Sequence, residues 1–273
     1  KEIRNFSVEQ GLINDNIKFI NQDSEGNIWL GTDGKGVMKF AGEAFITYTT
    51  SEGLSSDFVM NITEDQSGNL WFATYGEGAC KYDGKNYTVF NDENGLSNNT
   101  VWSTVVDNNN NVWFGTSNGL SVYDGVTMKS YYEEDGLLSN KVTSLAVQDS
   151  VLWIGNKEGL SRFCNGKFTG FSAENGIEGG NIRSICVDEN GILWLGGVSG
   201  LFSFDGKKAV NYKYDTSSSD NTVYCINKDK SGNLWIGTQN GLSRYAASGK
   251  GEKPTFINYS KKDGLFWETI LSI

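Results

Sequence analysis

A six-residue pattern centred on tryptophan recurs six times along this chain of 273 residues. The copies read NIWLGT, NLWFAT, NVWFGT, VLWIGN, ILWLGG and NLWIGT. Their tryptophans are Trp29, Trp71, Trp113, Trp153, Trp194 and Trp235, at successive separations of 42, 42, 40, 41 and 41 residues. A regular period of this length is typical of repeat proteins, in which each copy is one small structural unit.

Each copy contains four short strand-like runs with turn residues between them. In the second copy the runs are 58–65, 69–74, 78–84 and 86–92, and Gly, Asn or Asp stands at every junction. The chain has a single Pro, so almost every backbone N–H is free to join a sheet. Four antiparallel strands in about 40 residues, repeated radially, predict an all-β propeller of six complete blades. We expect no helix longer than a turn or two.

Two parts of the pattern that recur among the copies have structural explanations. The D-x-x-G-N element, such as Asp65–Asn69, suits a hairpin turn because Asp and Asn accept local backbone hydrogen bonds. Calcium binding is the alternative, but each turn brings too few carboxylates for a cage. We expect each repeat Trp to face the neighbouring blade, with the small residue two positions later allowing close approach of the backbones.

Composition limits the function. A net charge of −10 and a pI of 4.6 disfavour a nucleic-acid partner. No apolar stretch has membrane-spanning length, so no direct membrane insertion is expected of this segment. The chain has no histidine, which excludes an imidazole base, a His-ligated metal and a Ser-His-Asp triad. We expect no catalytic residue, no metal and no cofactor. The four cysteines have no metal-type spacing and fit small buried hydrophobes: Cys80, Cys164, Cys186 and Cys225.

The repeated string resembles the two-component regulator propeller repeat. Its third copy reads Gly95-Leu96 and Val101, then Trp113–Thr116, Gly119-Leu120 and Tyr123-Asp124-Gly125. The resemblance implies the extracytoplasmic sensor region of a bacterial hybrid histidine kinase or a related diguanylate cyclase, in a family whose well-known members detect glycan fragments. It therefore implies a periplasmic or extracellular location. The implied partners are an oligosaccharide ligand, neighbouring propeller or signalling domains of the parent protein, and a homodimer.

The sequence also predicts the domain boundaries, and it allows two interpretations of the number of blades. We interpret 1–273 as one propeller domain, with 1–10 a remnant of an outer strand and 264–273 the start of a further repeat. Family propellers usually have seven blades, whereas this chain has six Trp-centred copies. Either the ring closes at six, or the chain is part of a seven-bladed propeller or a larger array.

One column of the repeat varies while its neighbour is constant. The preceding position is always apolar: Ile17, Val59, Val101, Val142, Ile182 and Val223. The variable column, eleven residues before the Trp after allowing for a deletion in the fourth copy, is predicted to bind a ligand at the channel mouth. Its members are Lys18, Met60, Trp102, Thr143, Arg183 and Tyr224. A second variable patch is the turn after W-x-G-T, from Asp33–Lys35 in the first copy to Gln239-Asn240 in the sixth.

Three functions fit this sequence. A non-catalytic sensor would bind an oligosaccharide or similar polar ligand, because aromatic rings stack on sugars and cations pair with carboxylate or sulfate. A protein-docking or self-assembling scaffold is the second. A propeller lyase is the third, but the streptogramin-type lyases that share this architecture depend on histidine. The Glu133–Glu134 pair fits a solvated turn better than a catalytic dyad, because sequence neighbours point apart.

Overall fold

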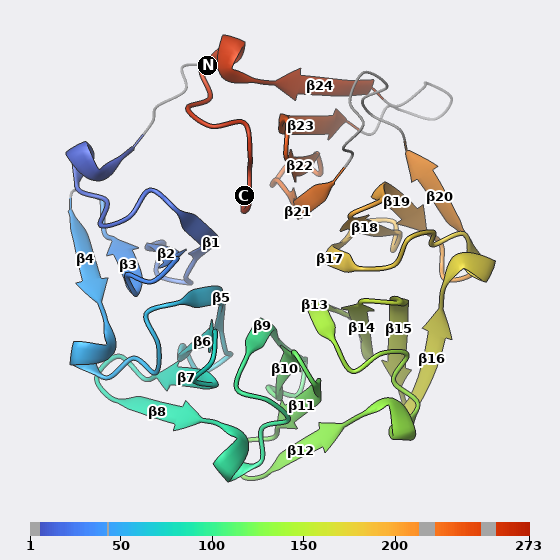
Figure 1. Cartoon of the computed structure of the whole chain (residues 1–273), viewed down its shortest axis with the longest axis horizontal. Coiled ribbons are helices and arrows are strands. Elements are labelled where there is room, and N and C mark those ends of the chain that lie inside the picture. The colour runs from blue at the N-terminus through green and yellow to red at the C-terminus, as the bar shows by residue number, and fades with distance from the viewer. Residues whose placement is uncertain (1–5, 43, 213–221, 247–254) are drawn as a thin grey trace.

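The strands form six separate antiparallel sheets arranged in a ring around a central channel (Figure 1). The computed structural model describes residues 6–42, 44–212, 222–246 and 255–273. Each sheet consists of four consecutive strands, with the first nearest the channel and the fourth at the periphery. The predicted all-β propeller of six four-stranded blades is confirmed.

The first three blades are as follows. Blade 1 contains β1 (Ile17–Gln22), β2 (Ile28–Thr32), β3 (Val37–Phe40) and β4 (Phe45–Tyr48). Blade 2 contains β5 (Val59–Glu64), β6 (Leu70–Thr74), β7 (Ala79–Tyr82) and β8 (Tyr87–Phe90), which confirms the four runs predicted for this copy. Blade 3 contains β9 (Val101–Val106), β10 (Val112–Thr116), β11 (Gly119–Tyr123) and β12 (Met128–Tyr131).

The second half of the ring follows the same plan. Blade 4 contains β13 (Val142–Gln148), β14 (Val151–Asn156), β15 (Gly159–Cys164) and β16 (Lys167–Phe171). Blade 5 contains β17 (Ile182–Val187), β18 (Leu193–Gly197), β19 (Gly200–Phe204) and β20 (Ala209–Tyr212). Blade 6 contains β21 (Val223–Lys228), β22 (Leu234–Thr238), β23 (Gly241–Ala246) and β24 (Thr255–Tyr259).

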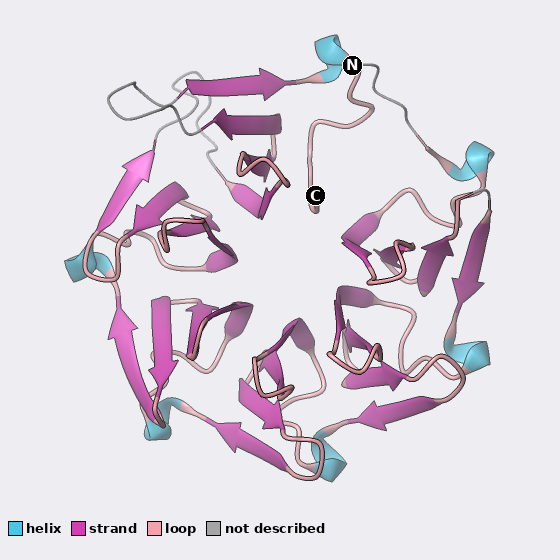
Figure 2. Cartoon of the chain, turned by 180° about the vertical axis from the view of Figure 1, so that it is seen from behind, coloured by secondary structure: helices cyan, strands magenta, loops and turns pink. Residues whose placement is uncertain are grey.

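Short 3-10 helices lie at the outer edge of the ring, and four of them connect one blade to the next (Figure 2). In η2 the Thr49 hydroxyl accepts the Ser51 N–H, and the Glu52 carboxylate accepts the Thr49 N–H at 2.7 Å. Gly53 ends the turn at a φ of 113°, a conformation that favours glycine. Within the described residues no helix is long and apolar enough to cross a membrane. The helices in the described part of the chain are η1 (Val8–Gln10), η2 (Thr50–Glu52), η3 (Asp92–Asn94), η4 (Glu133–Asp135), η5 (Ala173–Asn175) and η6 (Lys261–Asp263).

The hydrophobic core lies between blades rather than inside them. One cluster joins Trp71 and Ala73 of blade 2 to Val101 and Phe114 of blade 3. Trp71 is 1 % exposed, and its ring centroid lies 5.6 Å from that of Phe114. The equivalent tryptophans of blades 1, 3, 4 and 5 occupy equivalent clusters and are buried, as predicted. A large aromatic side chain at each junction explains why the pattern has to recur.

Trp235 of blade 6 departs from this arrangement because it is only half-buried. Its ring stacks on Tyr259 of its own blade, with centroids 5.8 Å apart, and the Arg244 guanidinium lies 5.9 Å from it. Among the described residues, no four-stranded sheet lies between blade 6 and blade 1. The sixth tryptophan therefore lacks the neighbour that buries the other five.

The small residue two positions after each Trp allows the backbones of neighbouring blades to approach closely, as expected. A Cβ added to Gly115 would lie 2.6 Å from Val142 Cγ1 of the next blade. At Gly155 it would lie 2.8 Å from the Ile182 carbonyl oxygen. Only a hydrogen at these positions lets the inner strand of the next blade pack directly against the backbone.

Residues 265–273 lie beside the channel, between β21 and β1 (Figure 1). The Ile270 N–H donates to the Thr238 carbonyl at 2.9 Å, and Asn227 Nδ2 donates to the Ile273 carbonyl at 2.9 Å. On the other side, the Ile20 N–H donates to Ser272 Oγ at 3.0 Å. This segment thus bridges the first and sixth blades. That 264–273 begins a further repeat stays a prediction. The predicted outer-strand remnant, 1–10, lies partly outside the described residues, and its described part contains η1.

Candidate functional site

A β-bulge at the start of every inner strand places the variable column in the channel. In blade 1, Ile17 pairs with Thr32 and Phe19 pairs with Gly31, so Lys18 is the extra residue with no partner. The same register shift occurs in the other five blades. A bulge redirects the side chain of its extra residue away from the regular pleat. Sequence reasoning found the column, and the bulge gives its geometric cause.

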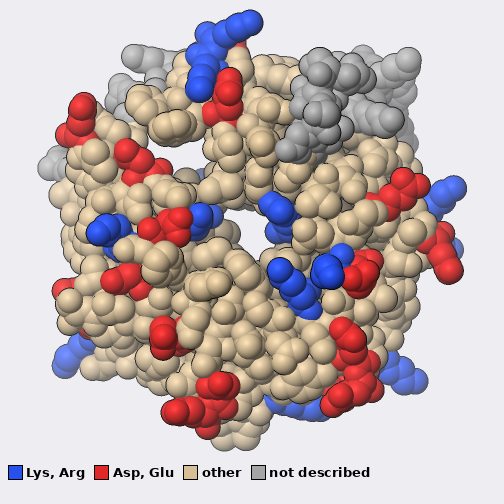
Figure 3. Space-filling view, in the orientation of Figure 1, with Lys and Arg blue, Asp and Glu red and all other residues tan. Residues whose placement is uncertain are grey.

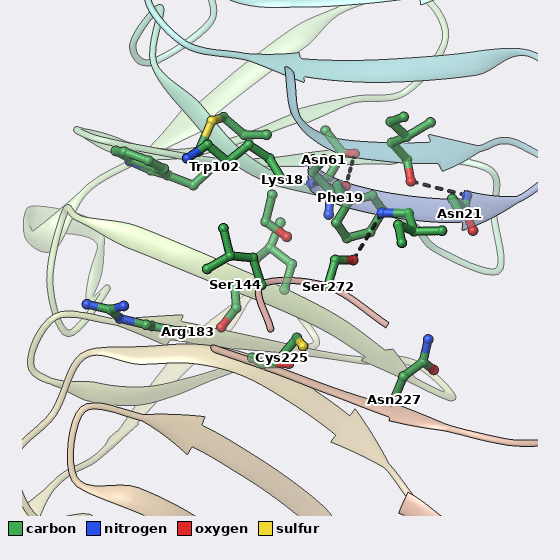
Figure 4. Close-up of a pocket in the computed structure, with 18 of the residues that line it drawn as sticks. Lys18, Phe19, Asn21, Asn61, Trp102, Ser144, Arg183, Cys225, Asn227 and Ser272 are labelled. Carbon is green, nitrogen blue, oxygen red and sulfur yellow. Dashed lines mark hydrogen bonds between the residues drawn. The ribbon is translucent and has the colours of Figure 1, made fainter. Parts of the chain in front are cut away.

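All six predicted residues line one cavity of about 530 Å³ along the channel. In Figure 4, Trp102 and Arg183 lie at one end of this cavity, and Asn21 and Asn227 lie at the other. We call the end with Trp102 and Arg183 the mouth. The members of the column are Lys18 of β1, Met60 of β5, Trp102 of β9, Thr143 of β13, Arg183 of β17 and Tyr224 of β21.

The two variable patches of the sequence contact each other at the mouth. Lys18 Nζ forms an ion pair with the Asp33 carboxylate of the following turn at 3.0 Å. The Tyr224 hydroxyl donates to Gln239 Oε1 at 3.1 Å. The turns after W-x-G-T therefore orient the side chains of the column.

Trp102 is held in the same way by two turns. Its indole N–H donates to Ser117 Oγ at 2.8 Å. Tyr75, from the turn of the preceding blade, meets its ring edge-on with centroids 5.9 Å apart. Trp102 is half-buried, unlike the repeat tryptophans of blades 1 to 5, which are buried.

Thr143 has a different environment from the other polar members of the column. Its hydroxyl donates to the Ile182 carbonyl of the next blade and lies 3.2 Å from the Gly155 carbonyl. Ser144 Oγ donates to the same Ile182 carbonyl at 3.0 Å. The Thr143 hydroxyl thus already has protein acceptors that tie blade 4 to blade 5.

Deeper in the channel the lining is small, polar and mostly uncharged. Asn61 Oδ1 accepts from Thr104 Oγ1 at 2.8 Å, which ties blade 2 to blade 3. Ser184 Oγ accepts the Ile226 N–H at 2.9 Å, which ties blade 5 to blade 6. Burial raises the pKa of the Cys225 thiol to about 12, so this group stays protonated and is not a nucleophile at neutral pH. The other side chains at this level include Ser103, Ser144 and Ser272.

Sequence reasoning missed one cation at the mouth and one segment of the lining. Lys141 Nζ lies 5.7 Å from the ring centroid of Trp102. It precedes β13 by one residue, outside the column, so repeat alignment gave no signal for it. Leu271–Ile273 also line the cavity because this segment lies at the inner edge of the ring.

Charge is unevenly distributed on this face of an acidic protein. Figure 3 shows basic atoms beside the central opening, while most acidic atoms in this view lie farther out. Glu64 is the one carboxylate among the described residues that line the cavity, and it accepts the Ser24 N–H at 2.7 Å. Cations therefore dominate the mouth although the chain carries a net charge of −10.

The repeat matches a known family. The model for the two component regulator propeller matches residues 11–34, 53–76, 95–118, 176–199 and 217–240. Each matched segment contains an inner strand with its bulge, the Trp strand and the start of the variable turn. The chain belongs to the two component regulator propeller family. The fourth copy is not matched, and there the D-x-x-G-N turn is replaced by the shorter Asp149-Ser150.

Solved structures resemble this regulator propeller at the level of the fold. The extracellular domain of a protein described as a hybrid two component system, BT3049 from B. thetaiotaomicron, matches with a TM-score of 0.82 and 23 % identity over 98 % of this chain and 38 % of that one. The extracellular domain of the B. thetaiotaomicron system BT4673 matches with a TM-score of 0.77 and 22 % identity over 96 % of this chain and 36 % of that one. The regulator propeller described here thus spans less than two fifths of either structure.

A streptogramin B lyase also has this fold, with a TM-score of 0.73 and 13 % identity over 92 % of this chain and 85 % of the lyase. At this identity the likeness concerns the fold alone. No protein with a curated description matches the chain by sequence.

Proposed function

We propose that this chain is a non-catalytic sensor module of a bacterial two-component regulator, on the periplasmic or extracellular side of the membrane. The family match supports the regulator role. Two structures with the same fold are described as extracellular domains, one of a hybrid two component system and the other of a one component system, which supports the location.

The ligand is an oligosaccharide or a similar polar molecule bound at the mouth of the channel. The observation that carries this proposal is the bulge, which in every blade directs the residue that differs between copies into one shared cavity. Cations and aromatic rings on a concave surface suit sugars and acids. The proposed contacts are Lys18, Trp102, Arg183 and Tyr224, with Met60 and Thr143 on the same rim.

A ligand at the axis would touch several blades at once. Its binding free energy would then favour one arrangement of the sensor over another, without any bond being broken. A related fold that does perform chemistry is the virginiamycin B lyase, of which a His-to-Ala variant is described as catalytically inactive. This chain has no histidine, so it offers no counterpart for that residue.

Isothermal titration calorimetry with a panel of neutral and charged oligosaccharides tests this proposal. A ligand should bind the wild type and bind the Trp102→Ala/Arg183→Ala variant much more weakly. Circular dichroism must first establish that the variant is folded. Unchanged affinity in the folded variant would place the site elsewhere.

A protein-docking scaffold remains the second candidate, because of a groove between blade 6 and blade 1. The groove encloses about 990 Å³ and is lined by Phe266 and Trp267, which are 60 % and 61 % exposed. Exposed aromatic side chains in a groove favour a protein partner. In this proposal the occupant is a neighbouring domain of the parent protein. Analytical ultracentrifugation of the chain with the adjoining domains, as wild type and Trp267→Ala, tests it: equal association of the two would contradict docking at this groove.

A further inference from the structure

The basic groups at the mouth differ in whether an acid neutralises them. Lys18 Nζ pairs with the Asp33 carboxylate at 3.0 Å. Lys157 lies 3.8 Å from Glu158, and both of these side chains are well exposed. Within the described part of the chain, Lys141 and Arg183 have no carboxylate within 4.0 Å. Arg183 in the cavity wall and Lys141 beside Trp102 are therefore two cations whose charge no described carboxylate offsets.

Both of these cations lie over aromatic rings. Lys141, at the start of blade 4, reaches back to blade 3, where its Nζ is 5.7 Å from the ring centroid of Trp102. Arg183, on blade 5, reaches forward to blade 6, where its Cζ is 5.1 Å from the ring centroid of Tyr224. The two pairs form an arc across four consecutive blades, which we call the cationic arc. Its members are Trp102, Lys141, Arg183 and Tyr224.

The rings fix the cations without cancelling their charge. An aromatic face attracts a cation through its quadrupole but accepts no proton and carries no net charge. The rings themselves are anchored, Trp102 to Ser117 and Tyr224 to Gln239. A guanidinium or ammonium group held in this way keeps donors free for an anionic oxygen, with less side-chain entropy to lose on binding.

The channel below the arc would not hold an anion as well. Its lining is mostly hydroxyl, amide and aliphatic, with Phe19 and Cys225, and its one described carboxylate, Glu64, lies there. An acidic group entering the channel would lose hydration without meeting a cation. The mouth is therefore the favourable level for a negative charge.

We propose that the cationic arc binds an acidic oligosaccharide, with its carboxylate or sulfate groups held by Lys141 and Arg183. This inference rests on the proposed function and makes it more specific: the sensor distinguishes acidic from neutral oligosaccharides. The arc assigns the acidic group to the side of blades 3 to 6, away from the Lys18–Asp33 pair.

The test compares one trisaccharide in three forms, by calorimetry at constant ionic strength. The probes are galactose trisaccharide, its sulfated form and its uronate form, galacturonate trisaccharide. We expect at least one acidic form to bind about tenfold more tightly than the neutral form, which is the effect of one hydrogen bond to a charged group. Which acidic form binds more tightly identifies the anion as sulfate or carboxylate. Inorganic sulfate should also raise the melting temperature in a saturable way.

The variant Lys141→Gln/Arg183→Gln should lose this preference and the response to sulfate. Lys129→Gln is the matched control, because Lys129 Nζ lies 4.6 Å from the Tyr131 ring on the outer strand β12, far from the channel. The control should behave as wild type.

Three results would overturn the cationic arc: equal binding of neutral and acidic forms, an unchanged preference in the double variant, or no saturable response to any acidic probe. Binding of the neutral form alone would preserve the sensor proposal while rejecting the arc. A fourth result is that inorganic sulfate binds through the arc while no neutral or charged oligosaccharide binds. It would show an anion site, and it would contradict both the acidic-sugar proposal and the proposal of an oligosaccharide sensor.

Discussion

The Asp65 carboxylate accepts the indole N–H of Trp71 at 2.9 Å. The same carboxylate accepts the backbone N–H groups of Ser67 and Asn69, so it joins the hairpin turn to the tryptophan between the blades. Equivalent Asp–Trp bonds of 2.7 to 3.1 Å occur in blades 1, 3, 5 and 6. In blade 4 the Gln148 amide oxygen accepts the Trp153 N–H instead, at 2.9 Å. The spacing of Asp and Trp recurs because one residue satisfies both the turn and the buried indole.

Replacing an inter-blade tryptophan should cost far more stability than replacing the tryptophan at the mouth. Trp113 is 6 % exposed and packs against Phe163 of the next blade, with centroids 5.3 Å apart. Trp113→Ala should lower the free energy of unfolding by about 3–5 kcal/mol, as large-to-small core changes do. Trp102→Ala should cost much less. Urea titrations of the two variants measure this difference, and equal losses would mean that Trp102 also belongs to the core.

The Asp–Trp bonds should make stability depend on acid pH. The hydrogen bond from Trp235, with those from Asn233 and Ser231, lowers the pKa of Asp229 from 3.8 to about 2. At Asp65, burial raises the pKa but hydrogen bonds from Trp71 and Asn69 outweigh it, and the net shift is downward. A pKa lowered by folding stabilises the protein above the unfolded value, and that contribution is lost as pH falls through the folded value.

Stability should therefore be constant above about pH 5 as far as these groups are concerned, and should fall between about pH 4 and pH 2. Urea titrations across this range measure the fall. Asp229→Asn should have a shallower pH dependence than wild type, because it lacks one titrating group. An identical slope in the variant would contradict the role assigned to the Asp229 carboxylate.

Much of this fold could be predicted because six copies of one pattern show the same strand and turn positions, even where a single copy is ambiguous. The strands of blade 2 were predicted within two residues, since turn residues recur at the same offsets in every copy. The Asp–Trp bond was not predicted, because a residue spacing of six does not reveal which side chains meet across a hairpin. The half-buried state of Trp235 also could not be predicted, since it depends on what lies beside blade 6 and not on its own repeat.

The candidate site was predicted in part for a related reason. The column from Lys18 to Tyr224 could be identified because its residues differ between copies while the rest of the repeat is nearly constant. The bulges bring these residues to one cavity. Lys141 could not be predicted because it belongs to the site only through its contact with the Trp102 ring on another blade. The ion pair between Lys18 and Asp33 was also invisible, because contacts between side chains are tertiary information.

Adding a methyl group where two blades meet should destabilise the ring. At Gly155 a Cβ would lie 2.8 Å from the Ile182 carbonyl oxygen and would also contact Ser144 Oγ. Gly155→Ala should lower the free energy of unfolding by about 1–3 kcal/mol, as overpacking does. Blade 2 has Ala73 at the same position, so the repeat itself tolerates a methyl group there. The expected loss of stability in Gly155→Ala therefore comes from the local contacts of Gly155. A denaturant titration without loss would mean that blades 4 and 5 separate to accept the methyl group.

Thr143 should contribute to stability rather than to ligand affinity, unlike its neighbours in the column. Its hydroxyl donates to the Ile182 carbonyl and lies 3.2 Å from the Gly155 carbonyl, so it connects two blades and has no proton free for a ligand. Thr143→Val keeps the shape of the side chain and removes the donor, and it should lower the free energy of unfolding by about 1 kcal/mol. Arg183→Gln, which removes a cation with no carboxylate partner in the described structure, should leave stability almost unchanged and weaken binding of an acidic trisaccharide. Urea titration and calorimetry on the same two variants separate these effects. Loss of binding without loss of stability in Thr143→Val would mean that the hydroxyl turns toward the ligand when the mouth is occupied.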